Sequence, residues 1–448
     1  MELNSERFVK LLGTLVGEGE LLQNWPAGGF VPREDLAAKH ILELLEPFSE
    51  AKGGPLKVEH IHLDPENSPE RGNIIIEYPA GASNDRVVSF VGSHMDVVFA
   101  NRENWAKDPF TMTFEDDVLY GRGTTDCLGH CALLTDLFLQ LAATKADLGG
   151  LKVIGVFICD EEAGGGGPVQ VGVDGLHAKG HLDCLANGPV FWLDCADKQP
   201  NIGSGGVVSW KLTAVGKMSH SGFPHKAINA VEFVSDATKE VQKAFYAAFP
   251  EVPKEKEYGF ECTSSMKPTR TSLPDGSLNQ IPGSCSVEGD IRLIPFYKIR
   301  DAMAVVEKAV AELNTVEALR ALEERGRPFH GPDSHYVLLD DEGNITAQAK
   351  LELKWGGEPI QGLACDLQSP GFKALAAATE AVIGHVKPLA DTGSLPLVAD
   401  LQEAGLDVQT IGYGVEDAYH ADNEFAHLSD FKQGFQVLMR VIHTLAQA

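Results

Sequence analysis

The chain has 448 residues, of which 44% are apolar and 23% charged, an ordinary mixture for two or three globular domains. Its 37 Lys and Arg residues are outnumbered by 64 Asp and Glu, which gives a formal net charge of −27. So acidic a chain argues against a nucleic acid partner, which needs a basic footprint, and against binding to anionic membrane surfaces.

Cysteine usage and the start of the chain indicate the compartment. Eight cysteines are scattered without a CxxC pair, and several lie in apolar stretches, as is typical of a reduced protein without structural disulfides. The first twenty residues carry four glutamates and resemble neither a secretory signal nor a transit peptide. No apolar run approaches the ~20 residues of a membrane span. We therefore expect a cytoplasmic protein.

Helical and buried-strand patterns alternate along the first part of the chain. Apolar residues at helical spacing predict helices within residues 31–48 and 128–145, and continuous apolar runs predict strands within 86–98, 151–162 and 188–197. Strands that alternate with helices favour a largely parallel sheet covered by helices on both faces.

The pattern changes near Gly203 and returns to the first style near residue 366. Between them, alternating strands and two longer helices predict a smaller α+β unit, and two helices flanking one strand follow it. We therefore expect a discontinuous main domain, residues 1–203 and 366–448, that is interrupted by an inserted domain, residues 204–365.

Polar side chains gather where the predicted strands of the main domain end. They are His94, Asp96, Asp126, the pair Glu161 and Glu162, Asp194 and His420. Ligand sites of open parallel sheets lie at the carboxyl ends of the strands. Each of these residues alone is weak evidence, but together they supply two imidazoles and several carboxylates without a thiolate cluster. That donor set suits zinc or a similar divalent ion.

The number of acids favours two ions rather than one. In an extended strand, Asp160 and Glu162 would point one way and Glu161 the other. Three adjacent like charges are tolerable when they face metal charge. Two ions a few ångströms apart could share one carboxylate, while one of the paired glutamates ligates and the other acts as general base.

These motifs resemble the M20 metallopeptidase family (aminoacylase/carboxypeptidase-like), with a close match to plant-type acetylornithine deacetylases. The stretches that carry the resemblance span nearly the whole chain: "GSHMDVV", "LYGRGTTDCLGH", "ICDEEAGG", "DCADKQP", "GKMSHSGFPHKAINA", "NQIPGSCSVEGDIRLIPFY" and "VQTIGYGVEDAYHADNEF". The resemblance implies an α/β fold in which a mostly parallel-sheet zinc-hydrolase domain carries an inserted α+β, ferredoxin-like lid and dimerisation domain.

The resemblance also implies roles for the residues at the strand ends. His94, Asp126, Glu162, Asp194 and His420 are then ligands of two divalent ions, Zn²⁺ or alternatively Co²⁺, with Asp126 bridging. Asp197 stays open as an alternative to Asp194. Glu161 is the general acid/base, Asp96 orients His94, and the Asp126–Cys127 peptide bond is cis. No role follows for Asp160.

In the inserted domain, the resemblance assigns catalysis to His220, which stabilises the oxyanion, often in the partner subunit's site. Asn279, Arg292 and Gly393 are expected to contact substrate. The expected activity is hydrolysis of an N-acyl amino acid, with N2-acetyl-L-ornithine as the leading candidate substrate. The expected assembly is a homodimer that binds neither nucleic acid nor membrane. An aminoacylase, dipeptidase or carboxypeptidase would share every catalytic residue. A nucleotide-dependent enzyme is disfavoured because the chain has no GxxxxGK[ST] and no full GxGxxG after a strand.

Overall fold

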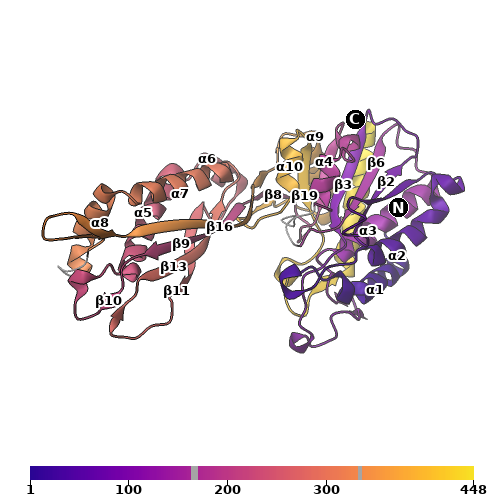
Figure 1. Cartoon of the computed structure of the whole chain (residues 1–448). Coiled ribbons are helices and arrows are strands. Elements are labelled where there is room, and N and C mark those ends of the chain that lie inside the picture. Colours follow the sequence, from indigo (N-terminus) through magenta and orange to yellow (C-terminus); the bar gives the residue numbers. More distant parts are fainter. Residues whose placement is uncertain (163–169, 331–334) are drawn as a thin grey trace. The chain divides into compact units, whose positions relative to one another are not determined.

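The computed structural model describes residues 1–162, 170–330 and 335–448 (Figure 1). The chain forms two compact units. Unit 1 contains residues 1–202, 364–390 and 396–448, and unit 2 contains residues 203–363 and 391–395. Among the described residues, none of the helices is both long and apolar enough to cross a lipid bilayer.

Unit 1 is built on a mixed sheet with a parallel centre. The strands follow the order β1-β2-β6-β3-β7-β19-β8-β17. β6, β3, β7 and β19 are parallel neighbours, whereas β1, β2 and β8 pair antiparallel at the two sides. Their bounds are β1 Lys57–His62, β2 Gly72–Tyr78, β3 Val87–His94, β6 Lys152–Ile158, β7 Pro189–Leu193, β8 Asn201–Ser204, β17 Leu363–Ala364 and β19 Asp407–Ile411. The predicted mostly parallel α/β class is confirmed, with antiparallel strands added at both sides.

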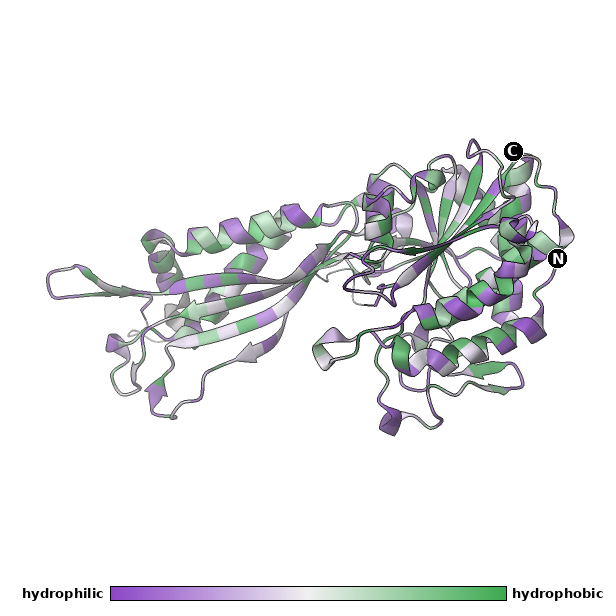
Figure 2. Cartoon of the chain, turned by 45° about the vertical axis from the view of Figure 1, so that its right-hand side comes forward, coloured by the Kyte–Doolittle hydropathy of each residue, from purple (hydrophilic) through white to green (hydrophobic). Residues whose placement is uncertain are grey.

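The central strands are continuous apolar runs because both of their faces are covered. Every residue of β3, β6 and β7 is buried, and Figure 2 shows these strands as largely hydrophobic. α3 packs on β2 and β3, α9 packs on β7 and β19, and α11 contacts both helices. The helices of unit 1 are α1 Ser5–Leu22, α2 Asp35–Leu45, α3 Leu128–Thr144, α4 Val173–Ala178, α9 Pro370–Ile383, α10 Val398–Glu403 and α11 Leu428–Gln447.

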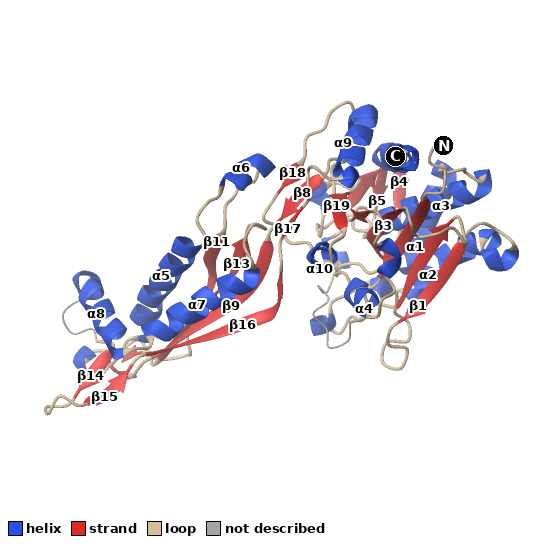
Figure 3. Cartoon of the chain, turned by 90° about the horizontal axis from the view of Figure 1, so that it is seen from above, coloured by secondary structure: helices blue, strands red, loops and turns tan. Residues whose placement is uncertain are grey.

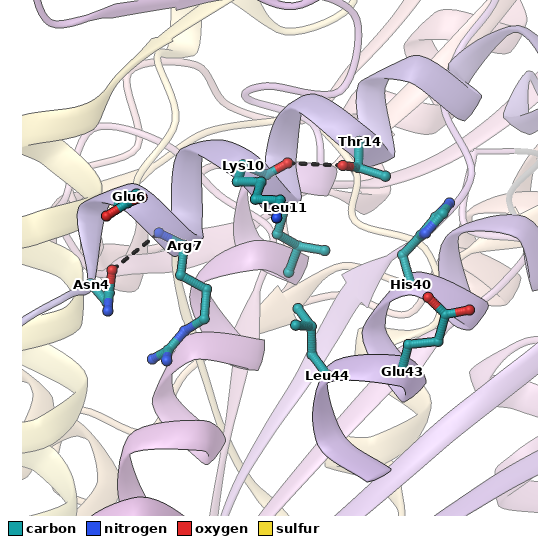
Figure 4. A pocket seen from close by; sticks show the side chains of 9 residues that line it. All are labelled: Asn4, Glu6, Arg7, Lys10, Leu11, Thr14, His40, Glu43 and Leu44. Atoms are coloured by element: carbon teal, nitrogen blue, oxygen red, sulfur yellow. Dashed lines mark hydrogen bonds between the residues drawn. The ribbon is translucent and has the colours of Figure 1, made fainter. Parts of the chain in front are cut away.

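Local signals set the ends of these helices. α9 begins after Ser369, whose hydroxyl accepts a hydrogen bond from the Phe372 N–H, and it ends at Gly384 in the left-handed conformation. α1 begins after Asn4, whose side chain accepts from the Arg7 N–H, beside a surface pocket between α1 and α2 (Figure 4).

Unit 1 also holds a small three-stranded sheet and a short added strand. The sheet consists of β4 Thr113–Glu115, β5 Val118–Tyr120 and β20 Phe425–His427. It joins a segment before α3 to the segment that follows His420 in the chain. β18 Leu389–Ala390 pairs with β8.

Unit 2 is a four-stranded antiparallel sheet with helices packed on it (Figure 3). The strand order is β11-β13-β9-β16, with bounds β9 Gly206–Val215, β11 Ser265–Ser272, β13 Ser284–Leu293 and β16 Lys350–Ile360. With α5 (Ala230–Ala248) after β9 and α7 (Ile299–Leu313) after β13, the chain runs strand-helix-strand-strand-helix-strand. This order is the ferredoxin-like arrangement.

Several elements are added to that arrangement. They are α6 Pro253–Tyr258, α8 Val316–His330, the ribbon of β10 Ser219–His220 with β12 Gln280–Ile281, and the hairpin of β14 Val337–Leu339 with β15 Ile345–Gln348. Unit 2 has a hydrophobic core of its own, in which Trp210, Tyr336, Phe233 and Phe245 are the largest buried side chains.

Candidate metal centre

The carboxyl ends of the parallel strands bring the predicted ligands of unit 1 together. β3 ends at His94, the acidic pair follows β6, and Asp194 directly follows β7. Parallel strands end at the same edge of a sheet, so side chains up to a hundred residues apart in sequence converge there.

Asp126 lies at the middle of this cluster. Its Oδ1 is 2.9 Å from Nε2 of His94, and its Oδ2 is 3.0 Å from Nε2 of His420. The two carboxylate oxygens therefore face two different imidazoles, which is the arrangement of a bridging ligand. The peptide bond that follows, Asp126–Cys127, is cis, as predicted.

The side chains of the paired glutamates point toward different histidines. Oε2 of Glu162 is 3.2 Å from Nε2 of His420. Oε2 of Glu161 is 3.9 Å from Nε2 of His94, too far for a hydrogen bond. The expected strand alternation is wrong here, because β6 ends at Ile158 and Asp160 has a positive φ of 62°. The backbone therefore turns before the pair, and the glycines at 164–167 lie outside the described residues.

Asp194, and not Asp197, reaches the cluster. Oδ1 of Asp194 is 3.8 Å from Nε2 of His94. Asp197 has a positive φ of 62°, and its carboxylate accepts a hydrogen bond from the Glu416 N–H at 3.2 Å. A left-handed turn thus directs the chain away three residues after Asp194.

One thiol also lies near the cluster. Sγ of Cys127 is grouped with His94 and Asp194, but it donates to the Leu193 carbonyl at 3.4 Å. Burial raises the pKa of Cys127 well above its usual value, which favours the neutral thiol over the thiolate. The donors are therefore imidazole nitrogens and carboxylate oxygens.

The electrostatics of the cluster fit divalent cations. Burial, followed by the charge of Asp126, raises the pKa of Glu162 to about 8. Burial also raises the pKa of Asp194 to about 6, and it raises the pKa of Glu161 well above the usual range. Oε1 of Glu162 is buried without a hydrogen-bond partner. Crowded acids with an unpartnered oxygen and two imidazoles are the donor set that two divalent ions would satisfy.

Asp96 holds the acidic pair in place. It is fully buried, and its carboxylate accepts hydrogen bonds from the N–H groups of Glu161 at 3.2 Å and Glu162 at 3.0 Å. Its Oδ1 also lies 3.4 Å from Nδ1 of His94. Asp96 therefore lies beside His94, which it is predicted to orient, and it also binds the backbone of both glutamates.

Glu424 holds the turn that carries Asp126, and sequence reasoning did not single it out. Its buried carboxylate accepts hydrogen bonds from the N–H groups of Gly123, Thr125 and Asp126 at 2.8–3.0 Å. It also pairs with the buried Arg122 at 2.7 Å. In the sequence, Glu424 lies four residues after the predicted ligand His420 and carries no pattern of its own.

Asp160, whose role the sequence left open, belongs to a buried polar network behind the acidic pair. Its Oδ1 accepts from Arg71 at 2.9 Å and from the Asn24 amide at 3.0 Å. Arg71 also binds Glu34 at 2.7 Å, and Asn24 donates to Asp96 at 2.8 Å. This network links the start of β2 and the residue before α2 to the carboxylate that holds the glutamates.

We expect Arg71→Met to destabilise unit 1 by about 3–5 kcal/mol, because it leaves two buried carboxylates without their cation. Urea unfolding measures the change. Arg33→Met is the matched control, since the Arg33–Glu70 pair is solvent-exposed and should cost below about 1 kcal/mol. Equal effects of the two substitutions would contradict the network.

The residues predicted in unit 2 fall into two groups. His220 and Asn279 lie in and beside the β10–β12 ribbon, where the Ser221 N–H donates to the Asn279 carbonyl at 2.9 Å. The His220 ring is exposed, and its Nδ1 accepts from the Gly222 N–H at 3.0 Å.

Arg292 and Gly393 lie near the opposite end of the sheet of unit 2. Arg292 pairs with Val207 at the start of β9 and binds Asp290 at 2.9 Å. The Gly393 carbonyl accepts from the Gly205 N–H at 2.6 Å, and the Gly393 N–H donates to Asp391 at 2.6 Å. The ribbon instead adjoins Ser284, eight residues from Arg292 along β13, or roughly 26 Å of extended strand.

Comparison with known proteins identifies the family of this chain. The model of peptidase family M20/M25/M40 matches residues 90–444, most of the chain and every residue of the cluster. The chain belongs to this family.

Curated relatives cover almost the whole chain. An acetylornithine deacetylase of Dictyostelium discoideum is 47% identical over 99% of this chain and 98% of its own length. An acetylornithine deacetylase of Arabidopsis thaliana is 46% identical over 99% and 97%. A dinuclear metal-binding M20 peptidase of Bacillus subtilis shares the fold, with a TM-score of 0.59 and 14% identity over 99% of this chain and 99% of its own.

Proposed function

We propose that this M20 protein is a dimetal amidohydrolase that deacylates an N-acyl amino acid, N2-acetyl-L-ornithine, to ornithine and acetate, as a step of arginine biosynthesis. The observation that carries the proposal is Asp126, whose two carboxylate oxygens face His94 and His420, with the Glu161 carboxylate 3.9 Å from His94. The choice of substrate rests on the near full-length similarity to two curated acetylornithine deacetylases.

The cluster divides into two proposed ligand sets that share Asp126. His94 and Asp194 complete one set, and Glu162 and His420 complete the other. We propose Zn²⁺ for both, with Co²⁺ as a substitute, because imidazole and carboxylate donors suit these ions. Ions bound there would supply Lewis-acid chemistry, by polarising the acyl carbonyl and making water more acidic.

Glu161 is the proposed general acid/base. It takes a proton from the attacking water and delivers it to the departing amine nitrogen. Asp96 keeps Glu161 in position through the hydrogen bond that it accepts from the Glu161 N–H. The raised pKa of Glu161 suits a group that must accept and then return a proton.

Unit 2 supplies the proposed substrate contacts. Arg292 is suited to bind the carboxylate of the substrate, and His220 is suited to stabilise the oxyanion. Gly393 and Asn279 are suited to contact other polar groups of the substrate. His220 lies in the β10–β12 ribbon, which adjoins one end of β13, whereas Arg292 lies toward the other end of that strand, a separation longer than one acylated amino acid. We therefore propose that a substrate meets them from two different chains, in a homodimer formed through unit 2, the proposed lid and dimerisation domain.

We also propose a cytoplasmic location. None of the eight cysteines is in a disulfide bond, and most are buried, as expected for a chain that works in a reducing compartment.

A substrate panel tests the proposed activity. The metal-loaded protein is assayed for kcat/KM on N2-acetyl-L-ornithine, N-acetyl-L-methionine, N-succinyl-diaminopimelate and a dipeptide. Acetylornithine should give the highest value. A higher value for acetylmethionine or the dipeptide would assign the protein as an aminoacylase or a dipeptidase instead.

Metal removal should abolish activity and also loosen unit 1, because the crowded carboxylates of the cluster would lose their counter-charge. Chelator-treated protein is titrated with Zn²⁺ while activity and melting temperature are followed. Activity should reach its plateau only when the second equivalent at the cluster is bound. Full activity with one ion per chain would contradict the two-metal proposal.

A further inference from the structure

A second group of metal-ligating side chains lies in unit 1, on the edge strand β1. His60 and His62 are two residues apart and therefore project from the same face of the strand. Asp35, the first residue of α2, faces both rings. Its Oδ1 lies 3.1 Å from Nε2 of His60, and its Oδ2 lies 2.7 Å from Nε2 of His62.

The three donors converge closely enough to hold one ion. Their ligand atoms lie within 4.8 Å of one another, and the two ring centroids are 4.4 Å apart. Donors about 2.1 Å from a single ion stand roughly 3.0–3.4 Å apart at angles of 90–110°. A cation between these atoms therefore requires displacements of less than about 1 Å from the observed positions.

Gly72 makes room for this convergence. It pairs with His62 across β1 and β2, and its N–H donates to Asp35 Oδ1 at 3.0 Å. A Cβ at this position would lie 2.2 Å from Nε2 of His60 and 2.7 Å from Oδ1 of Asp35. Gly72 is not among the residues with positive φ, so its backbone does not require glycine. Glycine is needed here because any side chain would fill the space in which the donors meet.

The surroundings are open to solvent and acidic. The side chains of Asp35, His60 and His62 each retain 27% exposure. Asp35 and His60 also line a surface hollow of about 520 Å³, whose other charged residues are Lys39 and three glutamates, Glu43, Glu46 and Glu50. The excess of negative charge favours the approach of a cation.

We propose that Asp35, His60 and His62 form a third metal site, which binds a divalent ion of the class that prefers imidazole, such as Zn²⁺. In the bound form, both rings keep their proton on Nδ1 and present the Nε2 lone pair, and the carboxylate completes a three-ligand site with positions open to water. This site lies outside the cluster around Asp126 and does not depend on the proposed reaction.

Zinc counting on matched variants of the metal-loaded enzyme tests the proposal. Wild-type protein and His60→Gln/His62→Gln protein are equilibrated at the same micromolar free Zn²⁺, and bound zinc is measured by mass spectrometry. The double variant should hold one equivalent less per chain. Gly72→Ala should lose the same equivalent, because its Cβ fills the space between the donors.

His40→Gln is the matched control. His40, on α2, also pairs with one carboxylate, Glu18 at 2.9 Å, but without a second imidazole (Figure 4 shows His40 in its own pocket). This variant should keep the full zinc content, and excess Mg²⁺ should not displace the extra ion, because Mg²⁺ prefers oxygen donors.

A spectroscopic readout locates the ion. Cu²⁺ added to the metal-loaded protein should give an electron paramagnetic resonance signal with coupling to two imidazole nitrogens, and this signal should be absent from the double variant. Equal zinc content in wild-type and double-variant protein would overturn the proposal. Because the count is a difference between variants, it fails or succeeds independently of the deacylase activity.

Discussion

Glu161→Gln is expected to lower kcat by at least about 10²–10⁴, the usual contribution of general acid–base catalysis. The loss could be larger, because the same carboxylate would both activate the water and protonate the leaving amine. Steady-state kinetics on N2-acetyl-L-ornithine measure the effect. Glutamine has nearly the same size as glutamate, and the substitution leaves the backbone N–H that donates to Asp96 at 3.2 Å. The position of residue 161 should therefore be preserved.

Metal content separates the two adjacent glutamates. Glu161 is not among the five proposed ligands, so Glu161→Gln should retain both ions. Glu162 lies 3.2 Å from His420 in the proposed second ligand set, so Glu162→Gln should bind less metal. A Glu161→Gln protein that keeps most of its kcat would assign the general base to another residue.

His220→Ala is expected to lower kcat by about 10²–10³ at unchanged metal content, as removal of one oxyanion donor usually does. His220 is exposed in unit 2 and has no part in the cluster of unit 1, so its loss should leave the ligands intact. His225→Ala is the matched control from the same loop and should leave kcat near its wild-type value.

Subunit mixing tests whether His220 acts on the partner's site. A His220→Ala chain and a Glu161→Gln chain are each nearly inactive, but a mixed dimer would contain one site with both residues intact. With free exchange at equal amounts, half of the dimers are mixed, so about one quarter of the wild-type activity should return. Verified exchange without recovery would place His220 in its own chain's site or outside catalysis.

Elements whose signals are local could be predicted from the sequence. Residues 128–145 read as a helix and the runs ending at His94, Ile158 and Leu193 read as buried strands, because apolar periodicity reflects what each segment buries. Parallel strands end at one edge, so finding polar residues after each strand was enough to predict that His94, Glu162 and Asp194 converge.

The tertiary structure alone decided how that edge is supported. Asn24, Arg71 and Glu424 carry no motif, and their partners are 72 or more residues away, except Glu34, which lies 37 residues from Arg71. The direction of the acidic pair was also predicted wrongly, because a left-handed Asp160 ends the strand alternation.

The same division holds for the sites that the motifs did not describe. His60 and His62 differ by two positions in sequence, an unremarkable pattern in an edge strand. Only the pairing of β1 with β2, which places Gly72 beside the rings, and the start of α2 at Asp35 bring a carboxylate to them. Periodicity records which face of an element is buried, whereas contacts between distant polar side chains depend on how the elements pack, and no local pattern encodes that.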